Sequence, residues 1–208
     1  MPDWDSIFRS KGHVFEESHT DMPAIVDLFK KHDIVRVLDA GCGTGRHLVY
    51  LAEQGFEVYG FDSSPHAVEM AMSWLRSRGY RPRVKLHKME EEFPYDDGFF
   101  DGIVSIQVIH HNLMSAIRFT VKEMVRVLRA KGILFVSFPI LGPTPKNGGW
   151  DFEEIESGTY IPHRGMEAGI PHHYFTTDEI PDVFCDFEIM EQYIDETGHR
   201  CVLAKRKP

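Results

Sequence analysis

Short apolar runs alternate with segments of helical periodicity along most of the chain. Residues 35–40 form an apolar run typical of a buried strand, and residues 46–54 show the apolar spacing of an amphipathic helix that Gly55 ends. Strands that alternate with helices in this way predict an α/β fold with a mostly parallel sheet. Four further runs have the pattern of strands: residues 57–61, 83–87, 101–108 and 133–138.

Capping residues and prolines predict where the helices lie between these strands. Thr20 or Asp21 can cap a helix with Pro23 in its first turn, and Pro65 opens another helix that Gly79 closes. A further helix is expected over residues 117–129, with Gly132 after it. The opening stretch, residues 1–20, is aromatic and reads as irregular.

The pattern changes after Pro139. Prolines and glycines indicate a loop, and residues 150–173 have no strong period, so a lid or insertion is expected at about 140–175. Thr176 and Glu179 have the spacing of a capping box for a short helix. Residues 187–194 and 200–204 then predict a terminal hairpin around residues 196–198, and the chain, residues 1–208, is expected to form a single domain. The loop residues are Pro143, Pro145, Gly148 and Gly149.

Composition limits the classes of partner. The formal net charge is −9, whereas nucleic-acid binders carry a basic face, so the balance favours a small-molecule partner over a nucleic acid. The three cysteines have no zinc or disulfide spacing. With no signal sequence and no membrane-spanning run, the chain is expected to be cytoplasmic.

A glycine-rich turn carries the strongest chemical signal. Gly41, Gly43 and Gly45 follow an apolar strand and precede a helix, where glycine allows a tight turn and close approach of a ligand to the backbone. Asp62 ends the next strand, about 20 positions later, which is the spacing at which a carboxylate meets ribose hydroxyls. The pattern predicts a cofactor that contains a nucleoside.

Two side chains bear on which cofactor this is. Arg46 stands where a dinucleotide-binding fingerprint has its last glycine, which weakens the case for a pyrophosphate. Asp39 lies just before the loop, where a carboxylate suits a ligand with a sulfonium and an ammonium better than one with two phosphates. Both side chains count against a dinucleotide, and an NAD-type oxidoreductase stays only as the alternative from a different class of function.

Five segments, in order and correctly spaced, are similar to the motifs of class I S-adenosylmethionine (SAM) dependent methyltransferases. The resemblance implies a Rossmann-like, doubly wound, mostly parallel seven-stranded sheet with an antiparallel last strand beside its neighbour. It also implies SAM as cofactor and S-adenosylhomocysteine as product. The segments are residues 37–45, 58–62, 93–101, 108–111 and 127–132.

The resemblance also implies roles for individual residues. The glycines would pass the methionine part of the cofactor, with Asp39 near its amino group and Gln107 close by. Asp62 would hold the ribose hydroxyls. The cofactor set is then Asp39, Gly41, Cys42, Gly43, Gly45, Asp62, Ser63, Met89, Glu90 and Gln107, in which Ser63, Met89 and Glu90 lie towards the adenine and Cys42 is a small packed residue.

Histidines are the candidates for acceptor chemistry, because a base is needed only where the methyl acceptor must lose a proton. His110 and His111 stand where the acceptor pocket should open, and His173 is a third candidate. His163, His172 and His173 could form a metal cluster, but no acidic or cysteine partner completes a known spacing, so no metal is expected.

The sequence therefore predicts a SAM-dependent methyltransferase that acts on a small molecule. A protein or RNA methyltransferase and a SAM-binding protein without catalysis remain open. The opening stretch and the segment near 140–175 would cover the acceptor. Aromatic residues that could line its pocket are Trp4, Phe8, Phe15, Trp150, Phe152 and Tyr160.

Overall fold

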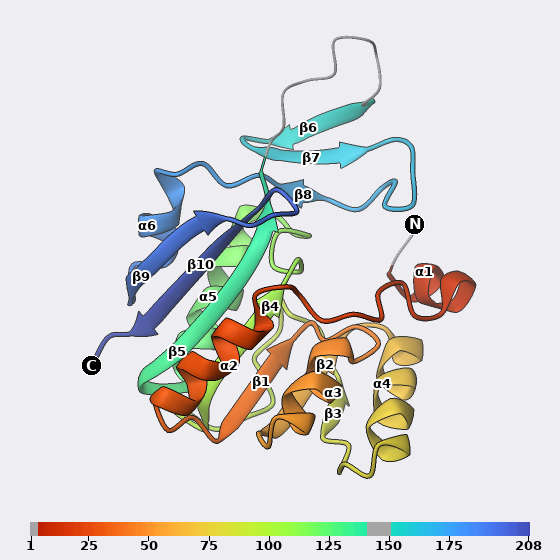
Figure 1. The fold of residues 1–208 in the computed structure, drawn as a ribbon. Coiled ribbons are helices and arrows are strands. Elements are labelled where there is room, and N and C mark those ends of the chain that lie inside the picture. The colour runs from red at the N-terminus through yellow and green to blue at the C-terminus, as the bar shows by residue number, and fades with distance from the viewer. Residues whose placement is uncertain (1–3, 141–150) are drawn as a thin grey trace.

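The computed structural model describes residues 4–140 and 151–208 and contains a seven-stranded sheet (Figure 1). The predicted Pro143, Pro145, Gly148, Gly149 and Trp150 lie outside the described residues. In the order of the sheet, the strands are β3 (Val84–Leu86), β2 (Glu57–Asp62), β1 (Arg36–Ala40), β4 (Phe100–Ile106), β5 (Leu128–Pro139), β10 (His199–Arg206) and β9 (Phe187–Ile194).

The strand order confirms the expected doubly wound sheet. Strand β1 pairs in parallel with both β2 and β4, so the chain winds outward from β1 in one direction and returns to build the other half. Strand β10 is antiparallel to β5 and to β9 and lies between them. This is the predicted terminal hairpin, with the last strand inserted beside its neighbour.

Helices cover both faces of this sheet (Figure 1). Apolar side chains of α2 (Met22–Lys31), α3 (Arg46–Glu53) and α4 (Pro65–Ser77) pack with one face of the strands. Those of α5 (Met114–Val127) and α6 (Glu179–Val183) pack with the other. Within the described residues, no helix is both long enough and apolar enough to cross a membrane.

Several element boundaries differ from the prediction, including the start of β5, which begins at Leu128 rather than at residue 133. Strand β4 was expected to reach residue 108 but ends at Ile106, because Gln107 has a left-handed backbone (φ +60°) that cannot continue a strand. Helix α5 begins at Met114 rather than at residue 117. It ends at Val127 rather than at residue 129, because Leu128 takes an extended conformation and pairs with Phe100 in the sheet.

The segment without a clear period forms a separate three-stranded sheet of β6 (Phe152–Glu156), β7 (Thr159–Pro162) and β8 (His172–His173). The small sheet lies beyond the carboxyl ends of the main strands (Figure 1). The backbone N–H of His173 donates to the carbonyl oxygen of His110 at 2.7 Å. This hydrogen bond joins the small sheet to the loop after β4. The capping box is confirmed, because Thr176 and Glu179 exchange hydrogen bonds before α6.

The expectation of an irregular opening stretch was wrong for helix α1 (Trp4–Lys11). This short helix buries Ile7 and Phe8 and is held by a long-range contact. The carboxylate of Asp5 accepts hydrogen bonds from the hydroxyl of Ser64 (2.6 Å) and the N–H of His66 (3.1 Å), at the start of α4. Sequence pattern does not show such tertiary contacts, which is why the helix was missed.

We predict that Asp5→Ala loosens α1. The substitution removes the acceptor that joins the helix to α4, so the amides of Trp4–Lys11 should exchange hydrogen several times faster than in the unmodified protein, a change that mass spectrometry measures. Asp5→Asn keeps an oxygen acceptor and should show a smaller effect. Equal exchange in Asp5→Ala and the unmodified protein would contradict this role of Asp5.

Candidate functional site

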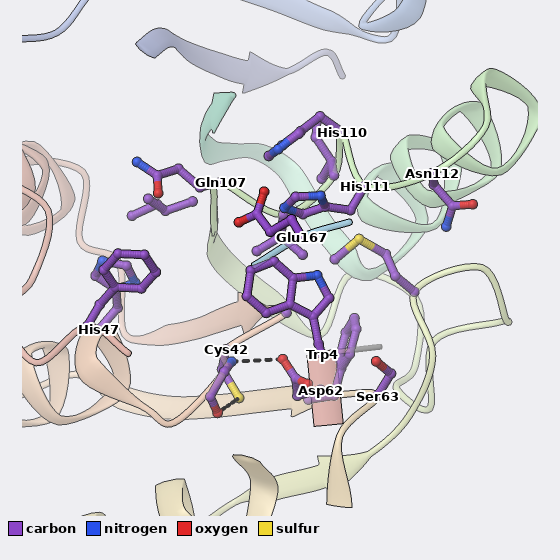
Figure 2. Close-up of a pocket in the computed structure, with 18 of the residues that line it drawn as sticks. Trp4, Cys42, His47, Asp62, Ser63, Gln107, His110, His111, Asn112 and Glu167 are labelled. Atoms are coloured by element: carbon purple, nitrogen blue, oxygen red, sulfur yellow. Dashed lines mark hydrogen bonds between the residues drawn. The ribbon is translucent and has the colours of Figure 1, made fainter. Parts of the chain in front are cut away.

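A pocket of about 340 Å³ opens at the carboxyl ends of β1, β2 and β4 (Figure 2). The chain turns away in opposite directions after β1 and β4, and ligands of doubly wound sheets bind in the crevice at this switch point. The glycine loop and Asp62 form one end of the pocket. The loop after β4 and part of the small sheet form the other end, and α1 contributes Trp4 and Phe8.

Glycine is required at two positions of the loop. At Gly41 the backbone is left-handed (φ +77°), and a Cβ there would lie 2.3 Å from Cγ1 of Val108. At Gly45 (φ +96°) a Cβ would lie 2.9 Å from the Cβ of Ala71 on α4. Side chains are excluded from both places, so the loop keeps its backbone close to the pocket.

Asp62 lies beside this loop in the pocket wall. Its carboxylate accepts hydrogen bonds from the N–H of Gly43 at 2.8 Å and of Ser64 at 2.9 Å. Burial raises the pKa of Asp62, and these two backbone hydrogen bonds act in the opposite direction. The carboxylate is therefore already oriented towards the glycine loop.

Asp39 is buried behind the loop with one carboxylate oxygen, Oδ2, that has no hydrogen-bond partner. The nearest imidazole nitrogen, Nδ1 of His47, is 3.9 Å from this oxygen. Burial raises the pKa of Asp39 to about 7, with the charge of Asp62 adding to the rise and that of Arg46 opposing it. A cation beside Asp39 would provide the missing partner.

Histidines crowd the other end of the pocket. The rings of His110 and His111 have centroids 3.9 Å apart, and the ring of His172 lies 4.6 Å from that of His111. Trp4 approaches His111 edge-on, with centroids 5.1 Å apart, and Glu167 lies beside it (Figure 2). The carboxylate of Glu167 is hydrogen-bonded to Nε2 of His172 at 2.6 Å.

His110 and His111 are held in the neutral form. Burial lowers the pKa of His111 to about 4, and the nearby His172 adds to this effect. Burial and the neighbouring histidines lower the pKa of His110 well below its usual value. The Nδ1 atoms of both rings are buried and have no hydrogen-bond partner. Neutral imidazoles with a free lone pair can accept a proton or bind a metal ion.

Most of the residues predicted from sequence line the pocket, and three do not. Asp39 and Gly45 are not among the lining residues, and His173 is fully buried against Thr159, whose hydroxyl is 2.8 Å from its Nδ1. The predicted residues that line the pocket are Gly41, Cys42, Gly43, Asp62, Ser63, Met89, Glu90, Gln107, His110 and His111.

Only some of the predicted cluster of histidines and of the predicted aromatic residues lie at the pocket. His172 meets His110 and His111 rather than His163, which is exposed. Trp4, Phe8 and Phe15 line the pocket. Phe152 and Tyr160 instead pack against each other in the small sheet, with ring centroids 5.1 Å apart.

Several lining residues carry no sequence signal that would have identified them. Glu167 and Tyr174 come from the segment without a period, and His199 comes from the start of β10. The side-chain amide of Gln107 is 3.4 Å from Nδ1 of His199, a contact across 92 residues of sequence. Only the assembled sheet brings these positions together. The other lining residues that sequence did not assign to the site include His47, His87 and Asn112.

We predict that the unpartnered Asp39 makes stability fall with rising pH. Because the carboxyl has a pKa of about 7 when folded and an ordinary value of 3.8, the folded protein retains a proton over this interval that the unfolded chain has lost. Between pH 5 and pH 8 the free energy of unfolding should fall by roughly 3 kcal/mol more in the unmodified protein than in Asp39→Asn.

Urea denaturation at the two pH values measures this difference. Asp27→Asn, which changes an exposed carboxylate on α2, is the matched control and should behave as the unmodified protein does. If Asp39→Asn showed the same pH dependence as the unmodified protein, the raised pKa of Asp39 would be wrong.

Comparison with known proteins agrees with this geometry. Residues 37–132 match the model of a methyltransferase domain. The methyltransferase GfsG of Streptomyces halstedii is 36% identical over 104 residues, which are 49% of this chain and 37% of that protein. The chain therefore matches well under half the length of this curated relative.

Solved structures share the fold over nearly the whole chain. A protein of Pyrococcus horikoshii superposes with a TM-score of 0.77 and 18% identity, covering 97% of this chain and 99% of that one. The 1,6-didemethyltoxoflavin-N1-methyltransferase of Burkholderia thailandensis, solved with bound 1,6-didemethyltoxoflavin and S-adenosylhomocysteine, has a TM-score of 0.72 and 21% identity, covering 98% and 85%. The glycine loop, the sheet order and the matched residues lead to one conclusion: residues 37–132 resemble a methyltransferase domain, on a fold shared with solved methyltransferases.

Proposed function

We propose that this protein transfers a methyl group from SAM to a small-molecule acceptor. One observation carries the proposal: a single pocket joins the glycine loop and Asp62 to a histidine-rich end that α1 and the small sheet cover. A cofactor and an acceptor could therefore meet in one pocket. The pocket volume lies in the range usual for small ligands.

The residues at the loop end suit SAM. The unpartnered Oδ2 of Asp39 can accept a hydrogen bond from an ammonium group that binds beside the loop. Arg46, which lines the pocket, can attract a carboxylate. Asp62 can bind a ribose diol, and Ser63, Met89 and Glu90 follow along the wall towards a space for adenine. This donor set complements an amino acid joined to a nucleoside. SAM, when bound, supplies an electrophilic methyl carbon on a sulfonium.

The chain's own residues would align the acceptor and exclude water, which accounts for most of the catalysis in such a displacement. A heteroatom of the acceptor forms the bond to the methyl carbon, the carbon–sulfur bond breaks with its electrons on sulfur, and the acceptor's proton leaves. The free Nδ1 atoms of His110 and His111 are the proton acceptors that face this end in the metal-free protein. His173 is less suited, because it lies outside the pocket wall.

The charge of the pocket lining favours a small acceptor over a nucleic acid. The pocket lining contains acidic side chains, Glu90 and Glu167, as well as the basic Arg46, and the chain has a net charge of −9. Phosphate backbones need a basic track, which these residues do not provide. Helix α1 and residues 151–175 would act as the cover over the acceptor within one domain.

We also propose a cytoplasmic location. The three cysteines are unpaired, and two of them, Cys42 and Cys201, are buried as ordinary small side chains. Free thiols of this kind are typical of proteins in a reducing compartment.

We predict that Asp62→Ala weakens the binding of S-adenosylhomocysteine. A hydrogen bond to a charged group contributes roughly 1.5–3 kcal/mol, so affinity should fall by about 10- to 150-fold. Calorimetric titration measures the change, with Asp27→Ala as the control carboxylate and circular dichroism to check that each variant is folded. Unchanged affinity in Asp62→Ala would exclude Asp62 from the cofactor site.

Turnover tests the proposed activity. The protein is incubated with SAM and a panel of small thiols, amines and phenols, and S-adenosylhomocysteine is measured against a sample without acceptor. We expect one class of acceptor to raise product formation well above that background, and His111→Gln to reduce the increase. Tight cofactor binding without turnover on any acceptor would favour a non-catalytic SAM-binding protein instead.

A further inference from the structure

Three imidazoles from two distant segments converge at the acceptor end of the pocket. His110 and His111 follow β4, and His172 lies on β8. One ring nitrogen from each histidine lies within 4.8 Å of the others. Figure 2 shows His110 and His111 with Glu167 beside them. Sequence spacing could not predict this group, because His172 lies about 60 residues after His110 and His111. The small sheet brings the three residues together.

Two of the three histidines have a ring nitrogen without a partner within the described residues. The Nδ1 atoms of His110 and His111 are buried and make no hydrogen bond. Leaving a buried polar atom unpaired destabilises a protein, so such atoms usually indicate a ligand or ion that completes them. Two unpaired imidazole nitrogens beside a third imidazole form the donor set of a metal site.

The third histidine is oriented as metal ligands usually are. Nδ1 of His172 is 2.8 Å from the carbonyl oxygen of Ile170, a contact that fixes the N–H on this nitrogen, and an ion bound to Nε2 would replace the hydrogen bond of Nε2 to Glu167. Metal-binding histidines commonly donate their second N–H to a backbone carbonyl in this way. Glu167, 2.6 Å from Nε2, adds a negative charge that favours a cation.

The backbone holds the two segments in register before any ligand binds. The N–H of His173 donates to the carbonyl oxygen of His110 at 2.7 Å, directly beside the imidazole group. The carboxylate of Glu156 accepts from the N–H of Met114 (2.6 Å) and the hydroxyl of Thr159 (2.9 Å), which fastens the small sheet to the start of α5. A site on supported elements is pre-organised and loses little freedom on binding.

We propose that His110, His111 and His172 bind one divalent transition-metal ion of the zinc class at the acceptor end of the pocket. Imidazole ligands suit zinc, cobalt, nickel and copper, whereas magnesium and calcium require oxygen ligands. Three protein ligands leave a coordination position open for a small molecule, as in catalytic zinc sites.

A second group of possible ligands, His19, Asp21 and Cys201, does not have this character. Nε2 of His19 is 2.9 Å from the carboxylate of Asp195, and its Nδ1 accepts from the N–H of Asp21 at 3.2 Å. Both ring nitrogens are therefore satisfied within the protein. His110 and His111, by contrast, each keep a buried Nδ1 without a partner.

The metal site would narrow the class of acceptor, and this part rests on the proposed methyl transfer. A zinc-class ion lowers the pKa of a hydroxyl or thiol that binds to it. The acceptor would then bind through such a group, form the new bond to the methyl carbon as the carbon–sulfur bond breaks, and release its proton to the carboxylate of Glu167. With the ion bound, His110 and His111 hold the metal rather than a proton.

Metal binding can be tested without turnover. Tag-free protein is treated with a chelator and titrated with zinc chloride against a chromophoric competitor, and with cobalt chloride while visible absorption is recorded. We expect one ion per chain and the absorption of cobalt bound to nitrogen ligands. His172→Ala and His111→Gln should each lower the affinity by more than the roughly 10- to 100-fold that loss of an outer partner causes.

Two controls make the result decisive. Glu167→Gln removes only the neighbouring charge and should weaken binding less than loss of a histidine does. His163→Ala, an exposed histidine of the same segment, should leave binding unchanged. Binding of S-adenosylhomocysteine and circular dichroism check that each variant is folded.

Failure of this proposal is distinguishable from failure of the proposed methyl transfer. If the protein bound S-adenosylhomocysteine but bound no zinc, or if the His172→Ala and His111→Gln variants bound zinc as the unmodified protein does, the metal site would be overturned and the methyltransferase proposal would stand.

Discussion

The close contact between the loops after β1 and β4 is the constraint on which the site depends. Gly41 lies against Val108 so tightly that even a methyl group would come within 2.3 Å of it. The same residue has a left-handed backbone, which glycine adopts without strain. Strands β1 and β4 are neighbours at the switch point of the sheet, so the chain turns away in opposite directions after them. Gly41 and Val108, which make the contact, both line the pocket that opens there.

The polar groups around this pocket are arranged for a ligand rather than for stability. Asp39 keeps a buried oxygen without a partner, and His110 and His111 each keep a buried nitrogen without one. Gln107, between the two ends, has the left-handed backbone that non-glycine residues rarely adopt. Unpaired polar atoms and strained backbone concentrate at functional sites, where a bound molecule supplies the missing contacts. Two such groups, one at each end of one pocket, agree with a site for two molecules.

The sequence predicts the frame of this molecule well because the frame is built from local signals. Apolar runs, the glycines at 41, 43 and 45, and the Thr176 and Glu179 cap each act over a few residues, and the structure contains the elements that they predict. The cofactor end of the pocket is likewise predicted from local signals, because the glycine loop and Asp62 follow adjacent strands of the sheet.

The parts that sequence does not predict depend on contacts between distant segments. Helix α1 is fixed by Asp5 against Ser64, and the meeting of His172 with His110 requires a small sheet whose strands have no clear period. Leu128 continues a helical sequence pattern but is extended in the structure, because it pairs with Phe100 in the sheet. In each case a tertiary interaction outweighs the local preference.

The central claim is that the Gly41–Gly45 loop and Asp62 hold SAM rather than a dinucleotide. Calorimetric titration of the purified protein with S-adenosylhomocysteine and, separately, with NAD tests it most directly. The structure predicts saturable binding of S-adenosylhomocysteine and none of NAD. Binding of NAD alone would contradict the account and make this loop a dinucleotide site.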